Sequence, residues 1–293
     1  MSVWAVVAHY GDPGVTGRAV AALLAGGATP DVVLVIDNQG DLPASDEATV
    51  EVVRPGRNLG FDGACVLGAR RALAAGARWV WLVNNDAEPD ATCLAELLAA
   101  GESEPRAGLL SPLIALRGQA GLWYAGGDID PGGLTVTHRT RPLTETPHDV
   151  PFITGCAWLA RAAFIEDCGP PDETLFMYFE DVDWSLRAQA AGWRTLLVPA
   201  ARAVHDVEFA RGRRVFSPFA VYLMTRNRLL VARRWGSRPK ALVAAISWGA
   251  RQLFKCRSLQ AAEAVTLALG AGLSHGLAGR RGPAPPSLAR KLR

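Results

Sequence analysis

The first hundred residues alternate between short β-branched runs and stretches suited to helices, and this alternation limits the folds that the chain can adopt. Four runs predict strands, at residues 3–8, 32–36, 50–53 and 79–83. Three further stretches predict helices, at residues 15–25, 63–75 and 88–100. This order predicts an α/β fold with an open, mostly parallel sheet and helices on both faces, in which ligands bind outside the carboxyl ends of the strands.

Composition indicates a globular protein of the cytoplasm. Of the 293 residues, 49% are apolar and 20% are charged, which excludes a disordered chain. The five cysteines show no C-x-x-C spacing, so we expect neither a disulfide framework nor a zinc knuckle. The first apolar run has no basic region before it and breaks at His9, so no signal peptide is expected. Charged residues interrupt the apolar stretch 241–279, and a membrane-spanning helix is not expected either.

Charge divides the chain near residue 210. Residues 1–210 hold 14 Lys and Arg against 27 Asp and Glu, whereas residues 211–293 hold 17 Lys and Arg and a single acid, Glu263. Halves so opposed indicate different partners, and the basic half suits an anionic membrane or a nucleic acid. We predict a catalytic domain over residues 1–210, a basic amphipathic helical segment over 211–278 and a disordered basic tail over 279–293.

The basic segment allows two interpretations. Its apolar residues, such as Phe219 and Leu230, fall near one helical face, and four arginines surround them: Arg226, Arg228, Arg233 and Arg234. Basic amphipathic helices are typical of membrane-surface elements, in which each cation contributes about 1 kcal/mol near an anionic leaflet. The alternative is a helical cap whose basic faces pack on the acidic domain.

Known nucleotide-binding loops match the sequence poorly. Gly11, Gly14 and Gly17 follow the first predicted strand with G-x-x-G-x-x-G spacing, which differs from the G-x-G-x-x-G of dinucleotide-binding folds. No G-x-x-x-x-G-K-[ST] is present. The sequence therefore argues against a hydride-transfer enzyme and a P-loop ATPase.

Polar residues follow three predicted strands: His9-Tyr10-Gly11, Asp37-Asn38 and Asn84-Asn85-Asp86. Asp86 comes after a strand suited to burial and two residues before Glu88, so both carboxylates can reach one ion. Divalent Mg²⁺ or Mn²⁺ is usually held by one or two carboxylates together with substrate phosphates. The alternative is a helix N-terminus, where Asn85, Asp86 and Glu88 would only cap the helix and oppose its dipole.

A second acidic group lies in residues 175–184, where Glu180, Asp181 and Asp183 follow an aromatic run. Carboxylates against a partly apolar wall have a raised proton affinity, which suits a general base. The alternative is an acidic first turn of a helix that continues through Trp184 and Arg187, although this does not explain three acids beside four hydrophobic residues.

These residues belong to a set that resembles a known family. The matching motifs are Asn58-Leu59-Gly60-Phe61, Leu82-Val83-Asn84-Asn85-Asp86, Thr154-Gly155-Cys156, Tyr178-Phe179-Glu180-Asp181-Val182-Asp183 and Val204-His205. In this order, over about residues 3–235, they resemble family 2 glycosyltransferases, and among these bacterial rhamnosyltransferases and galactofuranosyltransferases. The resemblance implies a GT-A fold, a Rossmann-like and mostly parallel sheet with helices on both faces, here followed by a C-terminal basic helical appendage.

The resemblance also implies a role for individual residues. Asp37 takes the place of an acid that holds the nucleobase, and Asn58 and Gly60 lie in the loop near the nucleotide. The implied donor-binding set is Tyr10, Asp37, Asn58, Gly60, Asn85 and Asp86. In the nucleotide loop, Asp62 replaces a small residue, and Cys65 and Val66 replace asparagines, so donor contacts differ there.

The implied metal ligands are Asp86, Glu88 as a weaker candidate, and His205, and the cation is Mg²⁺ or Mn²⁺. Asp181 matches the catalytic base and Glu180 its acidic neighbour. Such an enzyme stabilises the leaving nucleoside diphosphate with the cation, while Asp181 takes the proton of the acceptor hydroxyl; one displacement then inverts the anomeric centre.

Three functions stay open at this stage. The first is an inverting glycosyltransferase that moves a sugar from a dTDP-rhamnose-like or UDP-sugar donor to a lipid-linked or cell-surface glycan, with peripheral contact to the inner face of the cell membrane. The second is a soluble transferase that glycosylates a small natural product. The third is a nucleotide-sugar-binding module without turnover, which the presence of Asp86, Asp181 and His205 disfavours. No nucleic-acid partner is expected, and an oligomer is compatible with all three.

Overall fold

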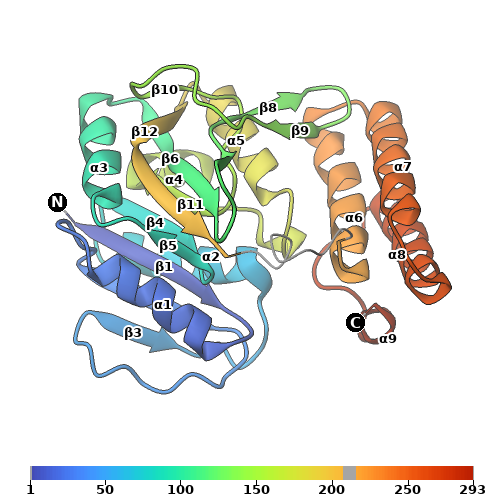
Figure 1. Cartoon of the computed structure of the whole chain (residues 1–293), viewed down its shortest axis with the longest axis horizontal. Coiled ribbons are helices and arrows are strands. Elements are labelled where there is room, and N and C mark those ends of the chain that lie inside the picture. Colours follow the sequence, from blue (N-terminus) through green and yellow to red (C-terminus); the bar gives the residue numbers. More distant parts are fainter. Residues whose placement is uncertain (1, 207–215, 293) are drawn as a thin grey trace.

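The computed structural model describes residues 2–206 and 216–292 (Figure 1). Its amino-terminal half is a parallel sheet of β1 (Val3–His9), β2 (Val32–Asp37), β3 (Val50–Val53) and β4 (Trp79–Asn84), in the spatial order β3-β2-β1-β4. The first five residues of β4 are buried, as expected for a strand covered on both faces. The α/β fold predicted from the sequence is confirmed.

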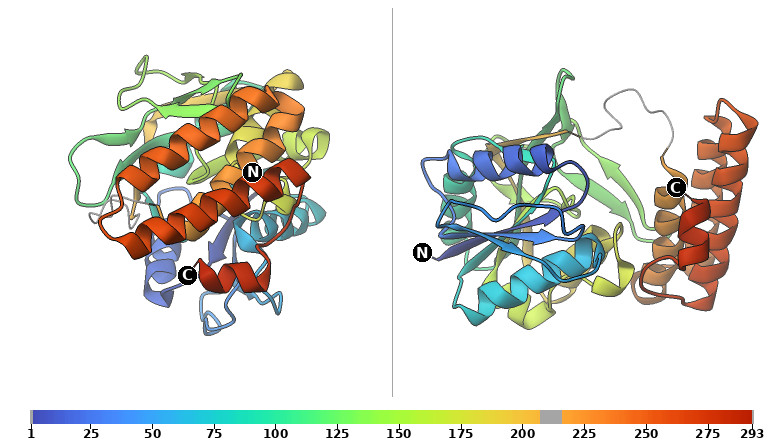
Figure 2. Two further views of the ribbon diagram at one scale, coloured as in Figure 1. Left: turned by 90° about the vertical axis from the view of Figure 1, so that its right-hand side faces the viewer. Right: turned by 90° about the horizontal axis from the view of Figure 1, so that it is seen from below.

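Helices cover both faces of this sheet. Figure 2 shows α1 (Pro13–Leu24) on one side of the strands and α2 (Gly60–Ala74) on the other. The side-chain carboxylate of Asp12 caps α1 by accepting the amide of Gly14 at 2.8 Å, and Pro13 opens the helix. Further along the chain, α3 (Cys93–Ser103) packs against the second half of the sheet.

The second half of the sheet mixes strand directions. β6 (Ala107–Leu116) and β12 (Arg194–His205) are parallel to each other, and β11 (Ala157–Arg161) joins β6 to β4 as an antiparallel strand. Shorter pieces complete it: β5 (Ala87–Pro89), β7 (Leu122–Tyr124) and β10 (His148–Asp149), with β8 (Gly127–Asp130) and β9 (Thr135–His138) as a separate hairpin. Along the chain, the helices α4 (Ala162–Cys168) and α5 (Glu180–Ala190) and the short 3-10 helix η1 (Glu173–Leu175) lie between β11 and β12.

One expected helix begins later than the sequence predicts. Residues 88–100 were expected to be helical, but Glu88 lies in β5, which pairs with β12, and α3 begins only at Cys93. Asn85 and Asp86 therefore precede a strand and Glu88 lies within it, so the interpretation of these residues as a helix N-terminus is wrong.

The carboxyl-terminal helices form a layer beside the sheet. α6 (Pro218–Trp235), α7 (Arg238–Phe254) and α8 (Leu259–Ala278) pack on one another, at the end of the molecule toward which β1 runs (Figure 2). None of the helices in the two described ranges is both long and apolar enough to cross a membrane.

Two expectations for this layer need correction. Arg226 and Arg228 are buried, with 0% and 6% exposure, so they do not form the exposed basic face proposed for a membrane-surface helix. Residues 279–292 are not a disordered tail, because they end in α9 (Pro286–Lys291) and Arg281 pairs with Asp172 at 2.8 Å. Residues 211–215, where the basic segment was expected to begin, lie outside the described residues.

Candidate active site

The three polar strand ends meet at one edge of the sheet. His9 at the end of β1 is in register with Asp37 at the end of β2, and Asn84 at the end of β4 pairs with Ala8. Tyr10, which follows β1, is half exposed at 51%. The side-chain amide of Asn85 donates to the carbonyl of Tyr10 at 3.2 Å, so the segments after β1 and β4 are tied together.

Asp86 and His205 lie side by side although 119 residues separate them. The Nε2 atom of His205 is 3.0 Å from Oδ1 of Asp86, and the backbone amide of Asp206 donates to the carbonyl of Asp86 at 2.8 Å. His205 ends β12, which reaches this edge because it pairs with β5 directly after Asp86.

This pair fits a divalent cation. Two ligand atoms at about 2.1 Å from an octahedral ion, in adjacent positions, lie about 3.0 Å apart, which matches the Asp86–His205 spacing. Carboxylate oxygen and imidazole nitrogen both suit Mn²⁺, and the carboxylate suits Mg²⁺. The side chain of Asp86 is 29% exposed, so phosphate oxygens of a substrate can reach the same ion.

Glu88 has other partners. Its two carboxylate oxygens pair with Arg18 at 3.2 Å and with Arg117 at 2.6 Å, and both arginines also lie 3.5 Å from Asp206. Of the three metal ligands implied by the resemblance, the structure brings together Asp86 and His205. Glu88 instead forms ion pairs with Arg18 and Arg117.

A second cluster of ligand-type residues contains His9, Asp37 and Asp41, whose ligand atoms lie within 4.8 Å of one another. The carboxylate of Asp37 accepts backbone amides from Gln39, Gly40 and Leu42 at 3.1, 2.6 and 3.1 Å. Burial raises the pKa of Asp37, but these amide bonds lower it by more. Asp37 therefore stabilises the loop after β2, and its oxygens are already engaged in the structure.

The loop before α2 depends on a glycine. Gly60 has a φ of +76°, and a Cβ there would lie 2.2 Å from the carbonyl oxygen of Phe176. Asn58 accepts the amide of Gly60 at 2.8 Å, and Asn38 accepts the amide of Leu59 at 2.9 Å. The predicted nucleotide loop is thus held against the end of β2.

Asp181 lies in the first turn of α5 and is only partly exposed. Its carboxylate accepts the amide of Val182 at 2.8 Å. Burial raises the pKa of Asp181 to about 6, even though the backbone amides of Val182 and of the nearby Gly155 lower it. The neighbouring Cys156 accepts the amide of Asn84 at 2.9 Å, so residues 155 and 156 connect Asp181 to the strand that precedes Asp86.

Glu180 is buried beside Asp62, which the sequence analysis noted only as a replacement for a small residue in the nucleotide loop. Asp62 is 0% exposed and Glu180 5%, and the Asp62 oxygens meet no amide, guanidinium or hydroxyl donor within the described ranges. Burial raises the pKa of both groups well above the ordinary values, and the charge of Glu180 raises that of Asp62 further. At neutral pH this pair favours holding a proton.

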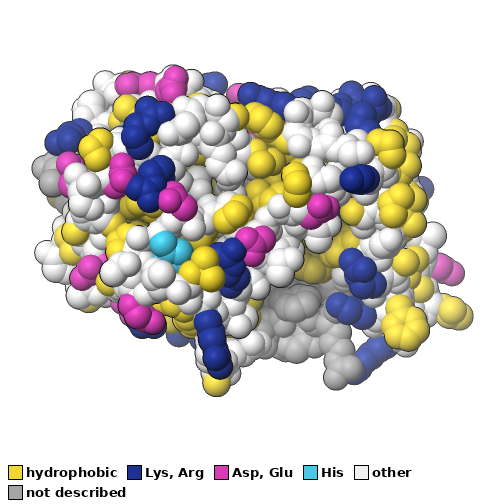
Figure 3. All heavy atoms as spheres, turned by 90° about the horizontal axis from the view of Figure 1, so that it is seen from above, with side chains coloured by type: hydrophobic (Ala, Val, Ile, Leu, Met, Phe, Trp, Pro, Cys, Tyr) yellow, Lys and Arg dark blue, Asp and Glu magenta, His cyan; other side chains and the backbone are white. Residues whose placement is uncertain are grey.

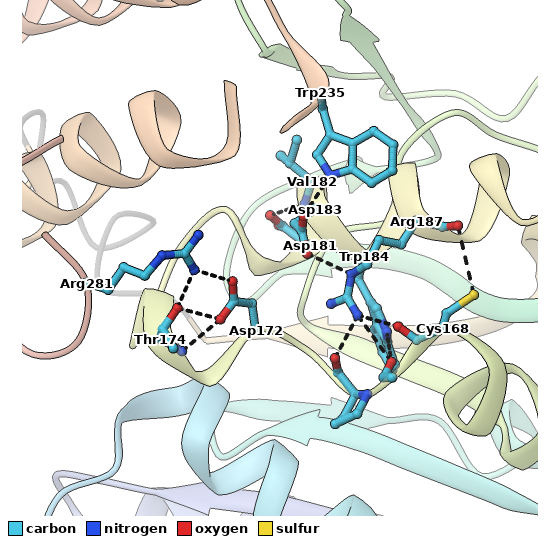
Figure 4. Close-up of polar contacts among 12 residues, drawn as sticks. Cys168, Asp172, Thr174, Asp181, Val182, Asp183, Trp184, Arg187, Trp235 and Arg281 are labelled. Carbon is cyan, nitrogen blue, oxygen red and sulfur yellow. Dashed lines mark hydrogen bonds and ion pairs between the residues drawn. The ribbon is translucent and has the colours of Figure 1, made fainter. Parts of the chain in front are cut away.

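Asp183 has a structural role. One of its oxygens accepts Nε1 of Trp235 at 2.7 Å and the other accepts Nε of Arg187 at 2.8 Å (Figure 4). The contact with Arg187 is buried and the contact with Trp235 is partly buried, so Asp183 ties α5 to the end of α6. Asp181 is therefore the acid of this group with a raised pKa and partial exposure, as a general base requires.

The loop before α5 is held by Asn227, which the sequence analysis missed, and by Arg226, which it had placed on a basic helix face. Phe176, Tyr178 and Phe179 all have a φ near +72°, which is rare for side chains of this size. The side-chain nitrogen Nδ2 of Asn227 lies within 3.0 Å of the carbonyl oxygens of residues 175, 177 and 178. The guanidinium of Arg226 also donates to the carbonyl of Leu175 at 2.8 Å. An Arg-Asn-Arg sequence on a buried helix face was the available signal for this role.

Trp123 was also missed. Its ring centroid lies 5.5 Å from that of His205, and the side chain is partly exposed on β7. An aromatic face beside the Asp86–His205 pair is a surface on which a sugar or base can stack. A single tryptophan in a short strand gave no sequence signal.

Comparison with solved structures identifies the fold. The chain is similar to GalNAc-T7, crystallised with UDP, GalNAc and Mn²⁺, with a TM-score of 0.64 and 20% identity over 80% of this chain and 48% of that one, so it spans about half of GalNAc-T7. It is also similar to residues 1–349 of TarS from S. aureus in complex with UDP-GlcNAc, with a TM-score of 0.59 and 13% identity over 100% and 84% of the two chains. The fold is that of the GT-A glycosyltransferases.

Sequence comparison gives the family. Residues 2–232 match the model of glycosyltransferase like family 2, and the chain belongs to this family. It is 30% identical over 240 residues to the N-acetylglucosaminyl-diphospho-decaprenol L-rhamnosyltransferase of Mycobacterium tuberculosis, covering 70% of this chain and 76% of the relative. Galactofuranosyltransferase GlfT1 of Mycolicibacterium smegmatis is 28% identical over 207 residues, or 65% and 66% of the two chains. The resemblance found in the sequence is confirmed.

Proposed function

We propose that this protein is an inverting, divalent-cation-dependent glycosyltransferase that moves a sugar from a nucleoside diphosphate sugar to a hydroxyl of a lipid-linked glycan. The observation that carries the proposal is the connection, through residues 155 and 156, between Asp181 and the strand that leads to the Asp86–His205 pair. Glycosyl transfer needs both a group that binds the diphosphate through a cation and a separate base for the acceptor.

The chemistry follows from these two groups. Asp86 and His205 would hold Mg²⁺ or Mn²⁺, which supplies positive charge to the departing diphosphate. Tyr10, Asn58 and Asn85 border the same edge and would contact the nucleotide. Asp181, with a pKa raised to about 6, is largely ionised at neutral pH and accepts the proton of the attacking hydroxyl. Attack from the face opposite the leaving group inverts the anomeric centre.

The relatives support the donor and acceptor classes. Both curated relatives are named for transfer of a deoxyhexose or a furanose, and one name specifies a diphospho-decaprenol acceptor. We therefore propose a dTDP-rhamnose-like or UDP-sugar donor and an acceptor with a lipid diphosphate, used by a cytoplasmic enzyme in peripheral contact with the membrane.

Thermal shift with purified protein tests donor binding. A panel of dTDP-rhamnose, UDP-galactofuranose and UDP-N-acetylglucosamine is measured with and without Mn²⁺, and a donor at 100 times its Kd stabilises the fold by about 2.7 kcal/mol. The stabilising donor is then incubated with a short-chain prenyl-diphosphate-linked N-acetylglucosamine, and NMR gives the anomeric configuration of the product. Absence of any metal-dependent shift, or a product that retains the donor configuration, would overturn the proposal.

A further inference from the structure

The helical layer has an exposed apolar stripe on α7. Val243, Ile246 and Phe254 are 63%, 46% and 93% exposed, and their spacing places them on one side of the helix. Leu259, the first residue of α8, is 85% exposed, so two large apolar side chains lie at the α7–α8 turn. We call Val243, Ile246, Phe254 and Leu259 the apolar edge.

Cations accompany the apolar edge. Arg251, Lys255 and Arg257 are exposed around the turn, and none has an acidic partner in an ion pair within residues 2–206 and 216–292. In the last 83 residues Glu263 is the single acid. Figure 3 shows hydrophobic side chains interspersed with Lys and Arg at the right-hand end of the molecule.

We propose that the apolar edge and its cations dock on an anionic phospholipid bilayer. Exposed Phe and Leu next to Lys and Arg match the interface of such a bilayer, where apolar groups enter the acyl boundary and cations meet headgroup phosphates. A second copy of the chain fits less well, because a two-fold contact would bring the same unpaired cations together.

The location of this surface suits the proposed function, on which this step rests. The layer of α6, α7 and α8 lies at the end of the molecule toward which β1 runs (Figure 2), and the catalytic edge is formed by the carboxyl ends of β1, β2 and β4. α6 also contacts the loop before Asp181 through Asn227. Docking of the helical layer thus holds the catalytic edge near a bilayer in which a lipid-linked acceptor is anchored.

Vesicle sedimentation tests the docking surface with the full chain. The vesicles contain phosphatidylcholine alone or with 30% phosphatidylglycerol, and three proteins are compared: wild type, Phe254→Glu with Leu259→Glu, and the control Leu143→Glu with Arg141→Gln. Leu143 is 63% exposed and Arg141 is exposed, both in a loop of the sheet domain, so the control changes a similar surface elsewhere.

We expect wild type and control to bind the anionic vesicles alike and the Phe254→Glu, Leu259→Glu protein to lose binding. Replacing Arg251, Lys255 and Arg257 together with Gln should weaken binding to the anionic vesicles about 100-fold, or about fivefold for each cation. Equal binding by wild type and the apolar-edge variant, or no binding of wild type to anionic vesicles, would overturn the proposal. A dimer that forms in solution and is abolished by the same variant would identify a second copy as the partner instead.

The readouts separate this proposal from the proposed function. Donor binding by calorimetry in the absence of vesicles should be unchanged in the apolar-edge variant. If wild type binds vesicles but no nucleotide sugar, the docking surface stands and the proposed function fails.

Discussion

The side-chain nitrogen of Asn227 lies 2.8 Å from the carbonyl oxygen of Tyr178, three residues before the proposed base Asp181. Tyr178 and its neighbours Phe176 and Phe179 have positive φ angles, and each such residue costs on the order of 1–3 kcal/mol. The loop keeps this conformation because α6 supplies donors to its carbonyls. The acids at the start of α5 and the helix α6 are therefore one structural unit.

Replacing Asn227 with Ala should release this loop. The carbonyls of Met177 and Tyr178 lose a buried donor, and unsatisfied buried groups cost about 1–3 kcal/mol each. We expect a lower melting temperature and a kcat reduced at least about tenfold, with a smaller change in donor Kd. Ser247→Ala, an exposed change on α7, is the control. A variant with wild-type kcat would show that the bond to Tyr178 does not position Asp181.

Asp86→Ala should abolish transfer and Mn²⁺-dependent donor binding, because the cation loses its carboxylate ligand. Glu88→Ala should do less, since Glu88 is held by Arg18 and Arg117. Calorimetry of donor with and without Mn²⁺ measures both variants. Similar losses of affinity in the two proteins would make Glu88 a full ligand.

His205→Ala should weaken Mn²⁺ and donor binding while leaving the base in place. Loss of a ligand or of its support typically lowers metal affinity about 10–100-fold. At saturating Mn²⁺ and donor, much of the turnover should return. A variant with unaltered Mn²⁺ affinity would remove His205 from the ligand set.

Asp62→Asn should stabilise the protein at pH 8. The pKa of Asp62 in the folded protein is raised by burial and by the charge of Glu180. An acid whose pKa is higher in the folded protein than in the unfolded chain stabilises the fold while it is protonated. That stabilisation is lost as the pH rises from the unfolded-state pKa of 3.8 toward the raised folded-state pKa. The gain in melting temperature over wild type should therefore shrink as the pH falls from 8 toward 4. A difference independent of pH would show that Asp62 does not carry this charge cost.

Much of the candidate active-site edge was predictable from sequence. The alternation of strands and helices predicts the parallel strands β1 to β4, and in such a sheet residues after the strands meet at one edge, as His9, Asp37 and Asn84 do. The approach of His205 to Asp86 was inferred from the family resemblance, because spacing alone does not bring together residues 119 positions apart.

The parts that could not be predicted depend on distant contacts. Ala87–Pro89 is a strand because β12 pairs with it, more than a hundred residues later. Arg226 and Arg228 look like an exposed basic face in a local pattern, yet Arg228 donates to the carbonyls of Gly133 and Leu134 at 2.7 and 2.8 Å. Burial of a guanidinium requires such acceptors, and local sequence does not reveal where they lie.

The Asp181→Asn variant tests the central claim most directly. Asn keeps the shape of the side chain but cannot accept the proton of the acceptor, so kcat at saturating donor should fall about 10²-fold or more while donor Kd with Mn²⁺ hardly changes. In the wild type, kcat/KM should be lost as the pH falls through about 6, because protonated Asp181 is no longer a base. The residual kcat/KM of the variant should not show this decrease at low pH. Wild-type turnover with an unchanged pH profile in Asp181→Asn would contradict the account and move the base to another group.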